Sequence, residues 1–482
     1  RTVDNNITDF LKDQLAHMDT SISMMVNSGA RGDISNVKLA SAMIGIQVDA
    51  ASREIELPIK SSYTGGLSSL EAFVATRGAR KGLIDTALKT ADSGYLTRRL
   101  VDVAQDVFTV EDVEGDDEGY AIYRSETEET MIDFSNRLAG RYAAETIPGH
   151  VNKDELITRE IADAIDDDES VQSVKIQSVL STNNLDGIPQ RSYGVDMSTG
   201  ELVKVHQPVG VIAAQSVGEP GTQLTLRTFH NSGVAGGDIT QGLPRVEELF
   251  EARTPKGQAF VTQIAGLVDI WEDGKNYIVQ VTPESGKVER LPLEGRTVEV
   301  KAGSSVKAGD VLASATEGSK PLIAPFHGVV ELAEDTLVIA AEAGSPARYE
   351  IPGTMQLVVK AGDFVEAGDR LTAGSLNLHD LMRLKGVEAT QRYIINEVLR
   401  IYAAQGQDVA DKHLEVIVRQ MFSRVQIEDP GDSEFVSGDI VSKAAVVAEN
   451  KRLAIDGKEL VSYTQLLLGI TKVSIWSDSW LS

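Results

Sequence analysis

A row of polar side chains on one expected helix has the chemistry of a polyphosphate site. Gln223, Arg227 and His230 fall at i, i+4 and i+7 of a helix that we expect to begin near Thr222, because threonine after a Pro-Gly turn is a good amino-terminal cap. A guanidinium neutralises phosphate charge through a planar fork of donors, and an imidazole can donate a proton near neutral pH. The glycine-rich stretch 231–238 is expected to be mobile, as in an active-site lid. A surface helix followed by a flexible turn fits the same pattern.

A second candidate element is a long helix expected from Ser68 to Val107, where apolar residues have helical spacing and proline is absent. Small hydroxyl side chains form one stripe at Thr86, Thr90, Ser93 and Thr97. Residues 76–100 hold six Lys or Arg and two Asp, a net charge of +4. A narrowed helix flanked by bases lets a bulky anionic partner approach its backbone. The alternative is a core helix whose small residues allow tight packing.

Elsewhere the charge is strongly negative. The 482 residues include 46 Lys+Arg and 72 Asp+Glu, a net of −26, and residues 111–169 alone hold 19 acids and 5 bases, a net of −14. We expect this acidic insert to be a solvated, partly flexible surface module, since neither acidic cluster has calcium-loop spacing. Cysteine is absent, which excludes disulfides and thiolate-bound metals. No histidine pair has ligand spacing, and no apolar run approaches the length of a membrane span.

The region 257–375 is expected to be β-rich. Residues 300–312 and 359–371 repeat a Val-Lys-Ala-Gly pattern with Gly-Asp turns, which indicates a sandwich-like barrel. Such hairpins also occur in biotinyl and lipoyl carrier domains, which need a lysine at an exposed tip. Residues 312–315 contain no lysine and Lys320 lacks the usual flanking methionines, so a structural module is favoured.

Helices and short strands are expected in the rest of the chain. Residues 1–47 fit two helices joined by a glycine-containing turn, and Ile55 to Ile59 fits a short edge strand because of Pro58. Val171 to Leu180 fits a strand, and residues 379–424 fit amphipathic helices. The last 60 or so residues fit a strand, turns and a helix ending near Leu468.

Two long runs resemble the largest (β′) subunit of bacterial RNA polymerase, in its carboxy-terminal portion. The run from Gly78 to Val103 resembles the bridge helix, and the run from Gly210 to His230 resembles the trigger-loop segment. Residues 24–32 are similar to the stretch that leads into the F-loop, and residues 385–388 and 411–421 resemble later helices. These matches are collinear and cover most of the chain.

The resemblance implies roles for individual residues. Arg227 and His230 match residues that meet the phosphates of the incoming nucleoside triphosphate, so they are the catalytic candidates. Substrate-binding roles are implied for three positions: Gln223 near the ribose, Leu226 on the base and Arg31 near the triphosphate. Thr90 and Ala91 match the part of the bridge helix against the template base. The nucleic-acid-facing set also includes four bases: Arg80, Lys81, Lys89 and Arg98.

The chain departs from the family at two functional places. No Asn-Ala-Asp-Phe-Asp-Gly-Asp-like motif occurs, so the carboxylates for the catalytic Mg²⁺ are expected outside this chain, which should be inactive alone as a fragment or split subunit. The four cysteines of the family's second zinc site are replaced by Glu114, Thr182, Pro189 and Ser192. No zinc is expected here, because none of these residues supplies a thiolate. Packing or hydrogen bonds should hold residues 178–194 instead.

The expected fold is α+β and multidomain, with a long bridge helix, a mobile helix-loop-helix, a β-rich barrel-like (sandwich-hybrid) jaw insertion and a helical carboxy-terminal part. The expected segments are a secondary-channel and F-loop segment (1–62), bridge helix (63–107), acidic insert with zinc-less remnant (108–200), trigger loop (201–256), jaw module (257–376) and helical cleft or clamp-side region (377–482). Expected partners are the β, α and ω subunits, a sigma factor, the amino-terminal part of β′, template DNA, the RNA–DNA hybrid and nucleoside triphosphates, in the bacterial cytoplasm and without a membrane. A structural scaffold for subunit assembly is the alternative function.

Overall fold

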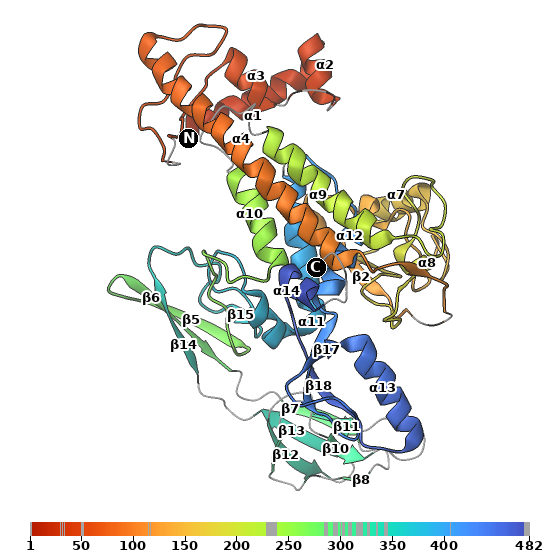
Figure 1. Ribbon diagram of the computed structural model, residues 1–482. Helices are drawn as coiled ribbons and strands as arrows, with labels where there is room; N and C mark the ends of the chain where they lie inside the picture. The colour runs from red at the N-terminus through yellow and green to blue at the C-terminus, as the bar shows by residue number, and fades with distance from the viewer. Residues whose placement is uncertain are drawn as a thin grey trace. The chain divides into compact units, whose positions relative to one another are not determined.

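A computed structural model gives the fold as a mixture of helices and strands, in agreement with the expected α+β class (Figure 1). It describes residues 2–28, 30, 32, 34–49, 53–113, 115, 117–227, 239–283, 288–292, 297–298, 300, 304–306, 311–314, 322–324, 328–333, 336–341, 346–404 and 406–476. The chain divides into two compact units: residues 1–252 with 391–482, and residues 253–390. Among the described helices, none is both long and apolar enough to cross a membrane.

The amino-terminal region holds three helices rather than the expected two. These are α1 (Thr2–His17), α2 (Ser21–Asn27) and α3 (Ile34–Ser41), and a capping box between Thr20 and Ser23 starts α2 afresh after α1. The edge strand expected at Ile55–Ile59 is wrong. In the described part of this region, pairing is limited to the single bridges Gly45↔Ile59 and Val48↔Glu54, because Pro58 cannot donate to a ladder.

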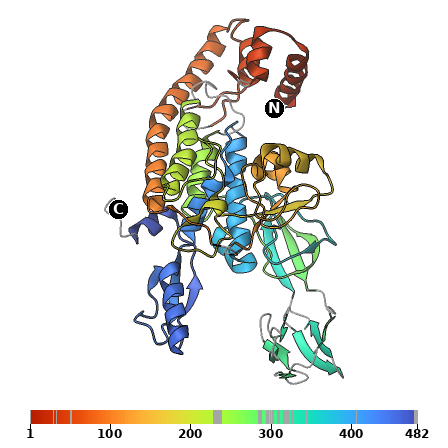
Figure 2. The same ribbon diagram turned by 90° about the vertical axis from the view of Figure 1, so that its right-hand side faces the viewer.

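The long helix is confirmed as α4 (Ser69–Ala104), which runs for 36 residues (Figures 1 and 2). Ser68 caps its amino end in a capping box with Glu71, so the start follows from local sequence. At the other end Leu96, Leu100 and Ala104 are buried, which fixes α4 in the core of its unit.

The helix expected to begin at Thr222 is wrong. Instead α9 (Val209–Arg227) runs without interruption through Pro220, and Thr222 is an interior residue whose hydroxyl lies 3.4 Å from the Gly218 carbonyl oxygen. An interior proline costs about 3 kcal/mol. Packing against α4, seen in Figures 1 and 2, offsets that cost over the length of α9.

Three further helices follow α9 in the chain. They are α10 (Ile239–Phe250), α11 (Leu378–Ala403), which has a non-helical break at Gly386 and crosses the boundary between the units, and α12 (Asp411–Met421). The helices expected within 379–424 are therefore confirmed. Nearly all of α12 is buried, and Val416 shares one apolar core with Val209 and Ala213 of α9.

The acidic insert is a folded module with an apolar core of its own, and most of its described acids are exposed, as expected of a solvated module. It contains β1 (Thr109–Val110), β2 (Tyr120–Tyr123), α5 (Glu126–Thr130), α6 (Phe134–Leu138), α7 (Arg159–Asp167), β3 (Ser173–Ile176), β4 (Ile188–Pro189) and α8 (Gln190–Tyr193). Strand β3 confirms the strand expected between Val171 and Leu180. On α7, Ala162 and Ile165 point into a core with Ile122 and Phe134, whereas Asp163 and Asp167 face water. Asp163 and Asp167 therefore occupy the polar face of an amphipathic helix.

The second unit is β-rich, as expected. One sheet has the order β14-β6-β5-β15, from β5 (Gly266–Asp273), β6 (Asn276–Thr282), β14 (Ala347–Pro352) and β15 (Phe364–Val365). A second has the order β7-β13-β12-β9, from β7 (Val288–Pro292), β9 (Ser305–Val306), β12 (Gly328–Ala333) and β13 (Thr336–Ala341). The third, β11-β10-β8, joins β8 (Thr297–Val298), β10 (Val311–Ser314) and β11 (Leu322–Ile323). Two separate apolar cores support these sheets.

The carboxy-terminal region differs from expectation in the position of its helix. The elements are β16 (Arg424–Asp429), β17 (Ile440–Ser442), α13 (Lys443–Asp456), β18 (Ser462–Gln465) and α14 (Ile470–Ile475), with sheet order β17-β16-β18. The helix expected to end near Leu468 ends at Asp456, because Gly457 adopts a left-handed conformation (φ 67°) and terminates it. Residues 462–465 then pair with β16 instead.

Candidate functional site: two antiparallel helices and their supports

Glycines let α9 lie directly against α4. A Cβ atom at Gly210 would be 1.8 Å from the Ala104 carbonyl oxygen, and one at Gly218 would be 2.3 Å from Thr97 Oγ1. Further along, the Ser93 and Thr222 hydroxyl oxygens are 3.1 Å apart. Residue numbers rise along α9 as they fall along α4, so the helices are antiparallel.

This packing places the end of α9 beside the middle of α4. Since Thr222 is level with Ser93, five more helical residues bring the backbone of Arg227 level with Leu88. Gln223 and Leu226 lie on the same last turns of α9. The substrate-binding and catalytic candidates of α9 are thus beside the stretch of α4 that contains Lys89, Thr90 and Ala91.

The hydroxyl stripe of α4 serves two surfaces. Ser93 and Thr97 face α9, which supports the packing interpretation, whereas Thr90 and the neighbouring Ala91 are exposed. Arg80 and Arg98 are also exposed, with Lys81 and Lys89 half-buried. Arg98 lies 3.9 Å from the half-buried Asp102 in an i, i+4 pair. The sequence therefore predicted close packing for this stripe but did not tell which of its residues would face α9.

Three of the predicted site residues cannot be placed beside these helices. Arg31 and His230 lie outside the described residues, as does Glu114 among the former zinc positions. For Gln223, Leu226 and Arg227 only the backbone in α9 is described. Their implied contacts with a nucleotide stay predictions.

A buried ion pair ties the end of α4 to α10 and α14. Arg99 pairs with Glu251 and, at 3.2 Å, with Glu247, and its guanidinium lies 4.2 Å from the ring centre of Tyr95. Glu251 also accepts hydrogen bonds from the hydroxyl and backbone N–H of Thr471. Arg99 is therefore neutralised inside the protein, and the exposed basic charge of α4 is smaller than its sequence count.

Helix α11 contacts both α9 and α10 through hydrogen bonds. The buried Tyr402 hydroxyl donates to the Val217 carbonyl oxygen at 2.8 Å, and Arg245 of α10 donates to the Tyr393 hydroxyl at 3.2 Å. The two helices that flank residues 228–238 are thus each held by α11.

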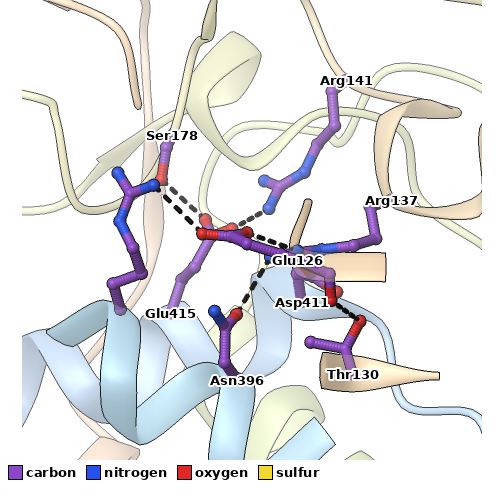
Figure 3. A network of polar contacts seen from close by, with 9 residues as sticks. Glu126, Thr130, Arg137, Arg141, Ser178, Asn396, Asp411 and Glu415 are labelled. Atoms are coloured by element: carbon purple, nitrogen blue, oxygen red, sulfur yellow. Dashed lines mark hydrogen bonds and ion pairs between the residues drawn. The ribbon is translucent and has the colours of Figure 1, made fainter. Parts of the chain in front are cut away.

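A network of buried charges joins the acidic module to α11 and α12 (Figure 3). Arg137 donates to Glu126 at 2.6 Å and to Asp411 at 2.7 Å, and Arg392 donates to Glu126 at 3.1 Å. Arg141 donates to Glu415, which also accepts from the Ser178 hydroxyl at 2.8 Å. Sequence reasoning missed this network, because its members lie up to 274 residues apart.

Two titratable groups on α12 are strongly affected by this surrounding. Burial lowers the pKa of Lys412 to about 8, with a further contribution from Arg141, while its ammonium contacts the Val195 carbonyl oxygen and lies 4.7 Å from the Tyr193 ring centre. Burial, with Lys412 and Arg141, lowers the pKa of His413 to about 4. His413 is therefore neutral at physiological pH.

The former zinc positions do not fit a metal. Thr182 Oγ1 accepts from the Asn184 backbone N–H at 3.2 Å, Pro189 has no donor atom in its side chain, and the Ser192 hydroxyl donates to Asp117 at 2.8 Å. No cluster of His, Asp and Glu in the described part of the chain is suited to hold a metal ion. Neutral hydroxyls are poor zinc ligands compared with thiolates.

Family models match nearly the whole chain. Residues 66–475 match the model of RNA polymerase Rpb1, domain 5, and residues 1–63 match that of domain 4. The chain therefore belongs to the RNA polymerase Rpb1 family.

Its similar relatives are β′ subunits of bacterial DNA-directed RNA polymerase. Those of Roseiflexus castenholzii and Roseiflexus sp. are each 43% identical over 96% of this chain, covering 32% and 31% of their own length. The β′ subunit of Caldicellulosiruptor saccharolyticus is 42% identical over 96% of this chain and 35% of its own. The resemblance to the carboxy-terminal portion of β′ is thereby confirmed. The chain spans about a third of the length of these relatives.

Proposed function

We propose that this chain acts in transcription as part of the β′ subunit of a DNA-directed RNA polymerase. In this proposal α4 is the bridge helix and presents Thr90 and Ala91 to the template base. Arg80, Lys81, Lys89 and Arg98 contribute positive potential toward nucleic acid. The segment from α9 to α10 is the trigger loop, which closes over the incoming nucleoside triphosphate.

The antiparallel packing of α9 on α4 is the observation that best supports this proposal. It brings the backbone of Gln223, Leu226 and Arg227 level with the exposed middle of α4. A nucleotide paired to a template base at Thr90 and Ala91 would therefore be within reach of the last turn of α9. Two helices without that register could not act on one substrate.

The chain's own residues bind and orient the substrate. Arg227 neutralises phosphate charge, His230 donates a hydrogen bond or a proton to the phosphates, Leu226 packs on the base, and Gln223 lies near the ribose, with Arg31 as a further phosphate contact. Mg²⁺, held by carboxylates outside this chain, supplies charge stabilisation for nucleotidyl transfer. The chain alone is accordingly expected to be inactive.

The proposed partners are the β, α and ω subunits, a sigma factor and the remaining part of β′, in the bacterial cytoplasm. The jaw assignment of the β-rich unit and the clamp-side assignment of residues 377–482 belong to the same proposal. A purely structural role in subunit assembly is the competing function, and the buried charge network of the acidic module is the feature that favours it.

Single-nucleotide addition by reconstituted polymerase separates the two functions. Arg227→Ala and His230→Ala should each slow addition by about 10²-fold or more while assembly is retained. Arg159→Ala is the control, because Arg159 is an exposed arginine paired with Asp163 on α7. Wild-type addition rates in both test variants would instead support the scaffold.

A further inference from the structure

The carboxylate of Asp117 is the centre of a hydrogen-bond cluster in the acidic module. Oδ1 accepts from the Gly119 backbone N–H at 2.9 Å and from the Ser181 hydroxyl at 2.5 Å. Oδ2 accepts from the Ser178 backbone N–H at 3.0 Å and from the Ser192 hydroxyl at 2.8 Å. Two donors therefore satisfy each oxygen of a largely buried carboxylate.

These donors come from segments that are distant in sequence. Ser178, Ser181 and Ser192 are 61, 64 and 75 residues from Asp117, so one side chain joins three stretches of chain. A single antiparallel bridge between Asp117 and Thr182 adds a backbone link at the same place. In the folded module these hydrogen bonds hold together segments that long loops separate, and the entropic cost of closing such loops rises only slowly with their length.

The cluster coincides with positions where the resemblance implies metal ligands in related chains. Ser192 and Thr182 stand at two of those positions, and both now make contacts to Asp117. The residues at these positions suit a carboxylate rather than a zinc ion, because a buried carboxylate needs hydrogen-bond donors and this type of zinc site needs thiolates. Burial raises the pKa of Asp117, and the hydrogen bonds from Ser181, Gly119, Ser192 and Ser178 oppose that rise.

We propose that Asp117 holds this module together in place of a metal ion, by tying residues 178–181 and Ser192 to the segment 117–119, so that the module folds without zinc. The tie extends beyond the cluster. The Ser178 hydroxyl donates to Glu415 of α12, which also pairs with Arg141, so Asp117 and α12 are linked through one serine (Figure 3). Since α12 shares an apolar core with α9, the link supports the helix that carries the candidate site.

Amide hydrogen exchange on the full 482-residue chain tests the tie directly, without reference to polymerase activity. In Asp117→Ala, exchange at the amides of Gly119 and Ser178 should accelerate by about tenfold or more, since both lose a charged acceptor. Asp196→Ala is the matched control. Asp196 likewise accepts several hydrogen bonds, but its three come from Ser198 and Gln207 within one local stretch. Its removal should therefore leave the amides of Gly119 and Ser178 protected from exchange.

A second variant and a zinc measurement complete the test. Asp117→Asn keeps the side-chain volume and one acceptor oxygen, so it should accelerate amide exchange less than Asp117→Ala does. It is the test variant to use if Asp117→Ala cannot be purified in a folded state. The unaltered chain should contain less than stoichiometric zinc by elemental analysis, and a strong chelator should leave its unfolding temperature unchanged. The proposal is overturned if Gly119 and Ser178 exchange equally fast in Asp117→Asn and in the unaltered chain. It is also overturned if the chain binds zinc whose removal unfolds residues 108–200. Neither result would affect the proposed function.

Discussion

The hydroxyl of Ser93 on α4 lies 3.1 Å from the hydroxyl of Thr222 on α9, although the two residues are 129 positions apart. The contact is one of several places where the two helices meet through small residues. Gly218 lies one turn before Thr222 and faces Thr97, one turn after Ser93, so the same face continues toward the start of α9. The position of the candidate substrate residues on α9 depends on this face.

Filling the face at Gly218 should separate the helices. A Cβ atom there would lie 2.3 Å from Thr97 Oγ1 and 2.6 Å from its Cγ2, so one of the two helices must shift. We expect Gly218→Ala to lower the free energy of unfolding by about 1–3 kcal/mol, the usual cost of overpacking. Urea unfolding of the full chain measures this change.

Two variants control for the added methyl group. Gly94 is a helical glycine of α4, the partner of α9, and a Cβ atom there would have no neighbour within 4 Å. Gly94→Ala should therefore be neutral or stabilising by up to about 1 kcal/mol. Combining Gly218→Ala with Thr97→Ala should recover part of the lost stability, because the closest two atoms are removed. Equal effects of Gly218→Ala and Gly94→Ala would contradict the packing.

The charge network should be costly to break at one partner. Glu415 is almost fully buried and accepts from both Arg141 and Ser178. Glu415→Ala leaves the buried Arg141 guanidinium uncompensated, so we expect a loss of about 3–5 kcal/mol in the free energy of unfolding. Thermal and urea unfolding of the full chain would show it.

An exposed pair in the same module provides the comparison. Glu145 lies 3.5 Å from Lys175, with about half of each side chain exposed, and Glu145→Ala should cost less than about 1 kcal/mol. Replacing both charges, as Arg141→Met with Glu415→Leu, should cost much less than Glu415→Ala alone, because no buried charge is left unpaired. A double variant as unstable as the single one would show that packing, not charge, holds the site.

The elements that sequence predicted well have local signals at their ends. Ser68 and Glu71 form a capping box at the start of α4, and the stretch that follows has no proline to interrupt it. Gly457, by contrast, was a local stop signal that overall apolar periodicity concealed, and the expected helix extended past it. Helix ends were predicted correctly where a capping signal and the apolar periodicity agree.

Long-range packing overrode local signals in two places. The Pro-Gly turn before Thr222 predicted a helix start, but Gly218 and Gly221 let α9 pack closely enough on α4 to continue through Pro220. In the acidic insert, net charge predicted a solvated surface, yet three of its five bases (Arg124, Arg137 and Arg141) point inward to buried acids or carbonyl groups. Net charge does not tell which face of a module is apolar.

From the sequence, only the residue types of the candidate site could be predicted, not how they are arranged in space. The polar row on α9 and the bases of α4 are visible in sequence, but their antiparallel register depends on contacts such as Thr97 with Gly218. Likewise nothing in sequence pairs Arg137 with Asp411, 274 residues away, or marks Asp117 among 72 acids as one that accepts from four donors.

His413 should make the stability of the chain sensitive to acid. Burial, with the nearby charges of Lys412 and Arg141, lowers its pKa from 6.5 to about 4. The unfolded chain therefore binds more protons than the folded chain between these values, so stability is full above about pH 6.5 and falls as pH decreases toward about 4. The contribution lost by about pH 4.5 is about 2–3 kcal/mol.

Replacing this imidazole should remove that contribution selectively. His413→Phe keeps a ring beside Tyr193, whose ring centre is 6.2 Å away. Between about pH 7 and about pH 4.5, its free energy of unfolding should fall by about 2–3 kcal/mol less than that of the unaltered chain. Urea unfolding at the two pH values gives the comparison, and His379→Phe, at an exposed histidine, is the control. Carboxylates protonate in the same range, but they do so equally in all three chains. Parallel pH profiles for His413→Phe and the unaltered chain would mean that His413 is not kept neutral by burial.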